Sequence, residues 1–239
     1  MVDQAAATGR ELRVLRAHNR AQAPWKNGGG ITREVAAGPA GAGLDDFSWR
    51  VSLAEVGQGG PFSSFAGVDR VIALVEGAGM ELTVDGFPHP VAAPFRPFAF
   101  PGDATTTCRL IGGPLVDFNV MTRRTEATAQ VHFACADFAP EDFALSPRQG
   151  ELILVIALLG TVTFDEPGVT LGRFDAALLS GGGAGADAGA GGGWDIGQDT
   201  DPGIGREPAP ATGRGIRQVR VEGAAAIVTL TPVPGSSGL

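Results

Sequence analysis

Short apolar segments separated by glycine and proline, without a helical repeat, constrain the fold of this chain most strongly. No long stretch repeats apolar residues at positions i, i+3, i+4 and i+7, the pattern of an amphipathic helix. Strand-like segments recur instead, with turn residues between them. In the clearest segment, Trp49, Val51 and Leu53 alternate with Arg50 and Ser52, so that the two sets face opposite sides. This pattern predicts an all-β chain that forms a sandwich or a barrel.

The expected strands form two sets, which predict two β units joined near residues 123–129. The first unit is expected over residues 10–122 and the second over residues 123–239. Asp85-Gly86 predicts a type I′ hairpin turn, and the prolines of Phe87-Pro88-His89-Pro90 predict a loop after it. The expected strands cover residues 12–15, 31–36, 49–56, 69–76, 80–84, 98–100, 106–111, 116–121, 131–135, 151–159, 160–164, 176–179 and 225–230.

One segment departs from this pattern. Residues 181–193 are almost entirely glycine and alanine, and polar sequence that contains proline continues to about residue 215. Such composition buries too little apolar surface to offset the entropy lost on ordering. We therefore expect a flexible surface insertion over about 181–215. A phosphate-binding loop is the alternative, but the segment lacks the GK[ST] ending of that motif.

The charge and the cysteines limit the partners and the compartment. The formal net charge of −8 argues against nucleic acid and anionic membranes as partners. Residues 1–20 lack the apolar region of a signal peptide. The longest apolar run, Leu152–Leu159, has eight residues, whereas a membrane helix needs about 20. Cys108 and Cys135 fit two reduced thiols. We expect a cytoplasmic protein, for which a homodimer is a possible assembly.

The densest polar motif is PWKNGGGITRE, over residues 24–34. The consecutive glycines Gly28–Gly30 allow positive φ angles and closely spaced amide groups, an arrangement that can bind an anion. Asn27 can both donate and accept hydrogen bonds, and Trp25 offers an apolar wall. The alternative is an ordinary tight turn between two strands.

Polar residues also interrupt two apolar strands. Arg50 shares a strand face with Ser52, and inside a barrel mouth its guanidinium would present a fork of donors to a carboxylate. Asp117 and Asn119 share one face of a later strand. Plain solvent exposure is the alternative for these residues, and the neighbouring pair Asp69-Arg70 favours a local ion pair.

Four motifs in a fixed order carry a family resemblance. They are WKNGGG-x-TRE, F-x-WR-x-S-x-A, GPFS-x-F-x-G-x-DR and GGP-x-x-DFNVM, which extend from Trp25 to Met121. In these motifs the chain resembles the HutD/Ves family, and the second half matches mainly in strands and lengths. The resemblance implies a double-stranded β-helix fold with two cupin-like barrels, a bicupin. It also implies an association with bacterial histidine utilisation and a ligand such as N-formylglutamate or urocanate.

The histidines do not form the pattern of a cupin metal site. Such a site needs several imidazoles and a carboxylate that converge on one ion. None of His18, His89 and His132 belongs to a His-x-His pair, so neither a metal nor another cofactor is expected. No Gly-x-Ser-x-Gly motif occurs and no catalytic residue is assigned. Glu34 and Asp117 could serve acid–base chemistry only if folding brings them together.

We therefore expect a metal-independent binder of a small anionic metabolite, which senses or buffers a histidine-degradation acid and modulates histidine utilisation. Arg50 would hold a carboxylate, Asn27 and the glycine amides a second polar end, and Trp25 and Phe62 the apolar part. One alternative is a cupin-type hydrolase or isomerase that acts on a small carboxylic acid. Another is an interaction protein that uses the Gly/Ala-rich insertion as a tether. The expected ligand-binding residues are Trp25, Asn27, Gly28, Gly29, Gly30, Glu34, Arg50, Ser52, Phe62, Asp117 and Asn119.

Overall fold

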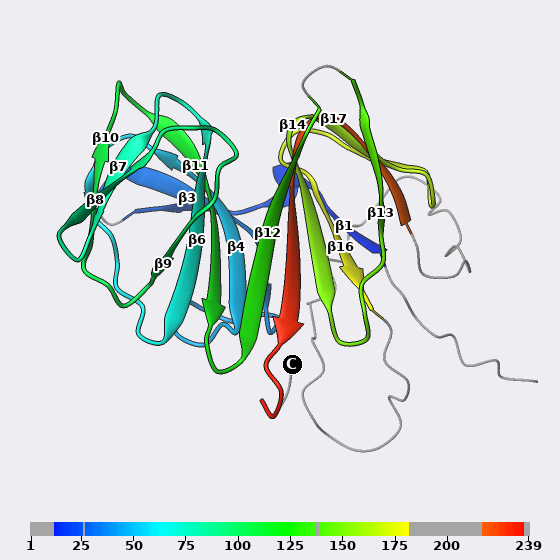
Figure 1. The fold of residues 1–239 in the computed structure, drawn as a ribbon, viewed down its shortest axis with the longest axis horizontal. Coiled ribbons are helices and arrows are strands. Elements are labelled where there is room, and N and C mark those ends of the chain that lie inside the picture. Colours follow the sequence, from blue (N-terminus) through cyan, green and yellow to red (C-terminus); the bar gives the residue numbers. More distant parts are fainter. Residues whose placement is uncertain (1–11, 26, 137–138, 182–216, 237–239) are drawn as a thin grey trace, which may run out of the picture.

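Three β-sheets stacked in layers make up the molecule (Figure 1). The computed structural model describes residues 12–25, 27–136, 139–181 and 217–236. The one helix in these residues is a short 3-10 turn, η1 (Ala17–Asn19), so the all-β prediction is confirmed. The insertion expected over 181–215 lies outside the described residues except for its first residue.

A six-stranded sheet forms the middle layer, with a four-stranded sheet and a seven-stranded sheet on its two sides (Figure 1). The middle sheet has the order β2 (Gln22–Pro24), β3 (Gly30–Gly38), β4 (Trp49–Val56), β11 (Leu115–Arg123), β6 (Val68–Glu76) and β9 (Phe98–Pro101). The four-stranded sheet has the order β5 (Gly60–Pro61), β10 (Thr106–Leu110), β7 (Met80–Val84) and β8 (Phe87–Val91). The seven-stranded sheet has the order β1 (Leu12–Leu15), β16 (Ala176–Ser180), β14 (Leu152–Phe164), β17 (Arg217–Pro232) and β12 (Ala127–Cys135), while β13 (Glu141–Leu145) pairs with β17 and β15 (Val169–Leu171) with β14.

The sheets differ from the prediction in two ways. Within the described residues no sheet closes into a barrel, so the double-barrel detail of the predicted bicupin is not confirmed. Strand β1 was expected in the unit of residues 10–122, but it pairs with β16 in the sheet of the C-terminal half. The reason is apolar burial, because Leu12 and Val14 pack against the cluster on the outer face of that sheet.

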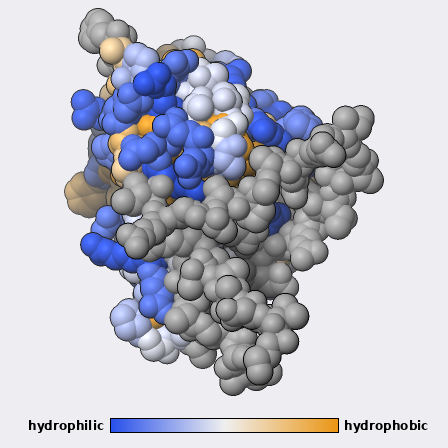
Figure 2. All heavy atoms as spheres, turned by 90° about the vertical axis from the view of Figure 1, so that its right-hand side faces the viewer, coloured by the Kyte–Doolittle hydropathy of each residue, from blue (hydrophilic) through white to orange (hydrophobic). Residues whose placement is uncertain are grey.

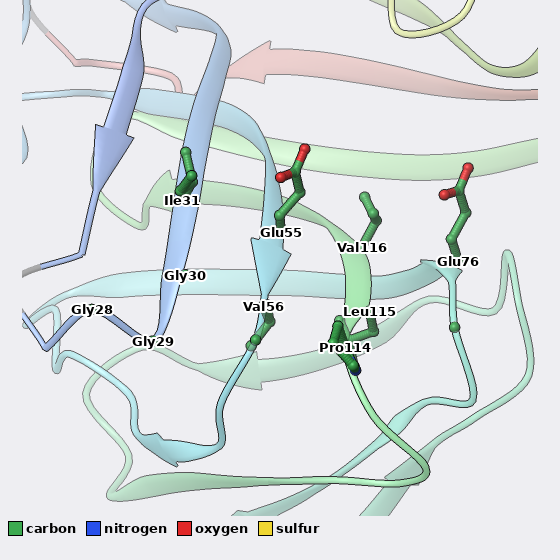
Figure 3. Close-up of a pocket in the computed structure, with 12 residues that line it drawn as sticks. Gly28, Gly29, Gly30, Ile31, Glu55, Val56, Glu76, Pro114, Leu115 and Val116 are labelled. Carbon is green, nitrogen blue, oxygen red and sulfur yellow. The ribbon is translucent and has the colours of Figure 1, made fainter.

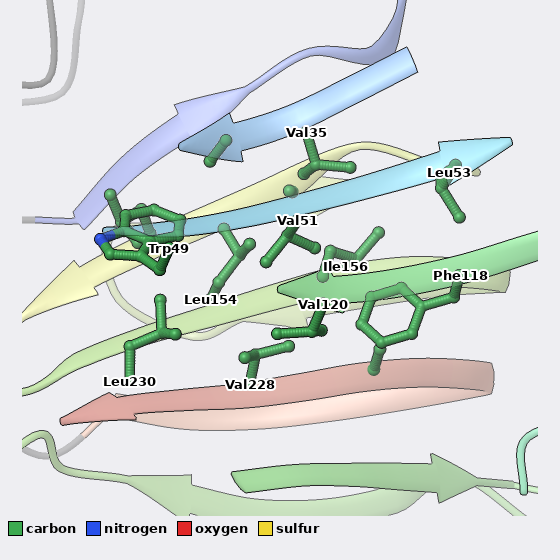
Figure 4. Packing of buried hydrophobic residues seen from close by; sticks show 14 of the residues in the cluster. Val35, Trp49, Val51, Leu53, Phe118, Val120, Leu154, Ile156, Val228 and Leu230 are labelled. Carbon is green, nitrogen blue, oxygen red and sulfur yellow. The ribbon is translucent and has the colours of Figure 1, made fainter. Parts of the chain in front are cut away.

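The two halves of the chain share one apolar core (Figure 4). Trp49 and Val51 from β4 and Phe118 from β11 lie in one fully buried cluster with Leu154 from β14 and Val228 from β17. The cluster fills the space between the middle sheet and the seven-stranded sheet. Because one core serves both halves, we expect them to unfold together.

Strand β14 is buried on both faces, as its continuous apolar run predicts. Leu154 faces the shared core, whereas Val155 faces a second cluster on the other side of the sheet. The sequence predicts two strands here, 151–159 and 160–164, but one strand runs through. It continues because Gly160 and Gly223 lie opposite each other, where a Cβ on Gly160 would lie 1.8 Å from the Glu222 carbonyl oxygen.

The hairpin of β7 and β8 confirms one prediction and corrects another. Asp85 and Gly86 have φ angles of 47° and 86°, as a type I′ turn requires. The segment after the turn was predicted as a loop, but it is strand β8. Pro88 and Pro90 are tolerated there because β8 is an edge strand that pairs only with β7.

The described surface offers no large apolar face. Figure 2 shows one side of the molecule. The coloured residues on that side are mostly hydrophilic, and the hydrophobic areas among them are small. Large exposed apolar side chains in the described residues are Leu44, Phe87 and Leu159, on separate elements. No helix in this part of the chain is long and apolar enough to cross a bilayer. Cys108 is buried and Cys135 is exposed.

Candidate functional site

A cavity of about 550 Å³ lies against the face of the middle sheet that is turned away from the shared core. We call it the polar cavity. Its volume falls within the range of about 300–1,000 Å³ that is usual for small-molecule sites. Its lining comes from β2, β3, β4, β5, β6, β11 and three loops. It consists of Ala23, Pro24, Trp25, Asn27, Thr32, Leu44, Arg50, Ser52, Ala54, Pro61, Phe62, Ser63, Phe65, Arg70, Asp117, Asn119 and Met121.

The strand register sets the height of each charged residue on the cavity wall. Strand β11 lies between β4 and β6, and Met121 pairs with Arg50 on one side and with Arg70 on the other. The two arginines are therefore two strand spacings apart, about 10 Å at Cα, at one level of the same wall. Asn119 lies one row further along the wall and Asp117 two rows further, where apolar residues close that end of the cavity.

Arg70 is a buried cation without an ion pair in the described residues. It is 6% exposed, and its Nε has no hydrogen-bond partner there. The rings of Phe62, Phe65 and Phe100 lie 5.0, 5.9 and 5.1 Å from its Cζ atom, close enough to attract the cation. Burial lowers the pKa of Arg70 to about 10, although Asp117 opposes this shift. Its hydrogen-bond donors are thus available to a molecule in the cavity.

The predicted ion pair between Asp69 and Arg70 is wrong. Neighbouring residues of a strand point to opposite faces, and Asp69 instead accepts a hydrogen bond of 2.6 Å from Nε of Arg124. Sequence reasoning therefore missed Arg70 as a cavity residue. A signal was present, because alternation puts Arg70 on the same strand face as Ile72 and Leu74, and that face is buried.

Arg50 is held at one edge by Glu34. Its Nε donates a hydrogen bond of 2.7 Å to Oε2 of Glu34, and the two side chains are 12% and 45% exposed. A β-bulge between Glu34 and Ala36 interrupts the ladder beside this pair, a common device next to functional sites. Within the described part of the chain neither Nη nitrogen of Arg50 has a hydrogen-bond partner. These two nitrogens can serve a ligand.

Two acceptor oxygens lie further along the wall without donors. Oδ1 of Asp117 and Oδ1 of Asn119 are buried and have no hydrogen-bond partner among the described residues. Burial raises the pKa of Asp117 to about 7, and the positive charge of Arg70 opposes that rise. Buried polar atoms are normally paired, since an unpaired one costs about 1–3 kcal/mol. The cavity therefore presents both donors and acceptors that a polar ligand would complete.

The glycine turn faces elsewhere. Gly28, Gly29 and Gly30 line a second hollow, of about 530 Å³, beside Val56 and Leu115 (Figure 3). The Gly28 amide donates to the Trp25 carbonyl oxygen at 2.9 Å, and the Gly29 amide donates to Oδ1 of Asn27 at 3.0 Å. These two amides stabilise the turn itself, as expected if the motif is an ordinary tight turn between two strands.

The turn orients one wall of the polar cavity. Nε1 of Trp25 donates a hydrogen bond of 2.7 Å to Oγ1 of Thr32, which fixes the indole.

Of the predicted ligand-binding residues, the structure brings seven together at the polar cavity and joins Glu34 to them through Arg50. It does not bring the three glycines there. The seven are Trp25, Asn27, Arg50, Ser52, Phe62, Asp117 and Asn119.

Replacing Gly30 by alanine should displace Trp25 and destabilise the fold. A Cβ at this position would lie 2.6 Å from the Glu55 carbonyl oxygen and 3.1 Å from the Trp25 ring. Relief of such a clash should cost about 1–3 kcal/mol in the free energy of unfolding, measured by urea denaturation. Gly43→Ala is the control, since its Cβ meets only Asp46 at 3.5 Å. Equal stability of the two variants would contradict this account of the turn.

The side chains do not fit a transition metal. Among the described residues no three His, Cys, Asp or Glu side chains cluster closely enough to hold an ion. The polar cavity offers one carboxyl group, on Asp117, and its two guanidinium groups repel cations. His89 lies in β8 outside the cavity lining, and its ring contacts that of Phe98 at a tilt of 33°, with centroids 4.7 Å apart.

Fold and site together define an all-β protein with a ligand-sized polar cavity in its N-terminal half. A model of the HutD family matches residues 17–193. The chain belongs to the HutD family.

Curated relatives match about half of this chain. An uncharacterized 21.2 kDa protein in the hutC 3′ region of Pseudomonas putida is 46% identical over 111 residues, which cover 46% of this chain and 58% of that protein. Protein Ves of Citrobacter koseri is 40% identical over 116 residues, 48% of this chain and 59% of Ves. The matched segment thus spans less than two thirds of these relatives.

Solved structures extend the similarity along the chain. HutD from Pseudomonas fluorescens SBW25 is 31% identical, with a TM-score of 0.68, over 93% of this chain and 100% of that chain. The bacterial pirin YhhW from Escherichia coli, solved in complex with nickel(II), is 10% identical with a TM-score of 0.56, over 93% of this chain and 99% of that one. The pirin shares the fold alone.

Proposed function

We propose that the chain binds a small carboxylic acid in the polar cavity, without a metal, and so senses or buffers an intermediate of histidine degradation. One observation carries this proposal: polar atoms of Arg70, Asp117 and Asn119 face a ligand-sized cavity without partners in the described residues. Leaving them unpaired would be costly in a permanently empty site. A bound molecule of complementary polarity would complete them.

The row order of the wall indicates how such a ligand would lie. Arg50 and Arg70 flank one level and could clamp a carboxylate from two sides, because each guanidinium can donate two parallel hydrogen bonds. Trp25 and Phe62 would cover the apolar body of the ligand. Asn119, further along, would accept a hydrogen bond from an N–H group. N-formylglutamate and urocanate each combine a carboxylate with an N–H group.

The link to histidine utilisation comes from relatives. The Pseudomonas putida relative is named for its place beside hutC, and the matched family is HutD. The matched residues include the segments that build the polar cavity. The names of the relatives and the polar cavity agree best with one function: the chain binds an acid of this pathway and thereby modulates histidine utilisation.

The C-terminal half then supports the site rather than repeating it. Buried apolar side chains fill both faces of its sheet. We propose that the two halves correspond to the two units of a bicupin in which only the first holds a ligand. This correspondence also accounts for the confinement of the polar motifs to residues before 122.

Arg50→Gln should weaken acid binding by roughly tenfold or more, since a hydrogen bond to a charged group contributes about 1.5–3 kcal/mol. Titration calorimetry with N-formylglutamate and with urocanate would measure the loss. Arg109→Gln is the matched control, because the Arg109 side chain is 68% exposed and pairs with Glu81 on the four-stranded sheet. Unchanged affinity of Arg50→Gln for every acid that binds would remove Arg50 from the site.

One observation favours an enzyme as the second candidate. Asp117 has a pKa raised to about 7 by burial, a value suited to a general acid or base near neutral pH. A hydrolase or isomerase acting on a small carboxylic acid would use it in that role. Turnover distinguishes the two functions, because an enzyme forms product beyond one equivalent of protein and a binder does not.

A further inference from the structure

We infer that the polar cavity takes up one proton, on Asp117, when it binds a carboxylate that has no hydrogen-bond donor of its own. This inference rests on the proposed function and adds its regulation. Ligand affinity would then follow cellular pH, and a fall in pH would fill the site at constant ligand concentration.

The arrangement of donors and acceptors is the first reason. The donors Arg50 and Arg70 lie at one level of the wall, whereas the unpaired acceptors of Asn119 and Asp117 lie one and two rows further along. A carboxylate brings further acceptors and no donor. Once it occupies both arginines, the acceptors further along remain unsatisfied. A proton on Asp117 supplies the missing donor.

The charges that face Asp117 are the second reason. Arg70 from β6 is the cation that acts on it, and Arg50 from β4 lies near enough to lower the pKa of Arg70. Burial raises the pKa of Cys108 from β10, and Asp117 lies near enough to raise it further. Glu34 from β3 is paired with Arg50 and 45% exposed. Among these groups, Arg70 alone favours the ionised carboxylate.

A bound carboxylate would offset the effect of Arg70, which favours the ionised form of Asp117. Its negative charge compensates Arg70 and Arg50, adds a like charge near Asp117 and displaces water, and each change favours the neutral carboxyl. The pKa of Asp117 starts at about 7 and rises further in the complex. Proton uptake is therefore largest above pH 7. Arg70 and Cys108 have pKa values of about 10 and 11, so at pH 8 they retain their protons before and after binding.

Titration calorimetry with glutarate, a dicarboxylate without a hydrogen-bond donor, tests the inference. The measurement is made at pH 8 in phosphate and in Tris, whose ionisation enthalpies differ, so that the observed enthalpies give the protons taken up. We expect nearly one proton per glutarate for the unmodified chain, and an affinity that tightens up to tenfold from pH 9 to pH 8. Asp117→Asn imitates the protonated form, so it should take up none and bind more tightly than the unmodified chain at pH 9.

Asp103→Asn is the control, since Asp103 is ion-paired with Arg124 outside the cavity lining and its pKa of about 2 lies far below the tested range. This variant should keep the full proton uptake. Glutarate binding without proton uptake and with constant affinity from pH 7 to pH 9 overturns the inference and leaves the proposed function intact. Absence of glutarate binding over the whole range overturns the inference, and absence of N-formylglutamate and urocanate binding as well overturns the proposed function. The uptake by the unmodified chain decides the matter even if Asp117→Asn does not fold.

Discussion

Arg70→Met is expected to weaken the binding of any small carboxylate about a hundredfold while leaving the fold intact. Arg70 is 6% exposed, and aromatic rings lie close to its guanidinium, so bulk solvent competes weakly for its donors. Loss of two charged hydrogen bonds, about 3 kcal/mol together, corresponds to about a hundredfold in the dissociation constant. Titration calorimetry with N-formylglutamate and glutarate would measure it.

The same substitution should not destabilise the protein. Arg70 is a buried cation whose Nε has no hydrogen-bond partner in the described residues, which is costly. Apolar replacement of buried charges is often neutral or stabilising by about 1–4 kcal/mol. Asp117 must be neutral for this comparison, so urea unfolding of Arg70→Met is measured at pH 6, below the Asp117 pKa of about 7. Exposed Arg109→Met is the control for affinity. Full affinity of Arg70→Met would refute the assignment of Arg70, and a large loss of stability would make Arg70 structural.

Phe118→Ala should cost about 3–5 kcal/mol in the free energy of unfolding, the usual loss for a buried phenylalanine. Phe118 is 0% exposed and lies in the core shared by the middle and seven-stranded sheets, where Phe133 from β12 meets it with ring centroids 5.6 Å apart. Because both halves lose contacts, the urea transition should move to lower concentration and stay a single step. Circular dichroism and tryptophan fluorescence should report the same midpoint.

Phe87→Ala is the matched control for this loss. Phe87 is 69% exposed on the edge strand β8, so its truncation should change stability by no more than about 0.5 kcal/mol. Two separate transitions in either protein would show that the halves fold independently. That outcome would contradict the claim that the shared core makes the two halves unfold together.

Alternation along the strands predicted much of the fold and much of the cavity wall. Arg50 and Ser52 opposite Trp49 and Val51 in β4 follow directly from period two. The same rule placed Asp117 and Asn119 on one face of β11. Both pairs line the polar cavity.

What sequence reasoning could not supply is the pairing of distant strands. Arg70 enters the site only because β6 lies beside β11 in a register that places Arg70 level with Arg50. The glycine turn has the composition of an anion site, yet its own carbonyl and Asn27 take up two of its amides. Strand β1 joins the C-terminal sheet through contacts more than 150 residues away. Such long-range choices leave no local pattern in the sequence.

The most direct test of the account is a crystal structure of the chain with glutarate bound at pH 6. We predict one carboxylate between Arg50 and Arg70, within hydrogen-bond distance of both guanidinium groups, and the rest of the molecule directed along Asn119 toward Asp117. Glutarate bound at the Gly28–Gly30 hollow, with the polar cavity free of it, would contradict the account.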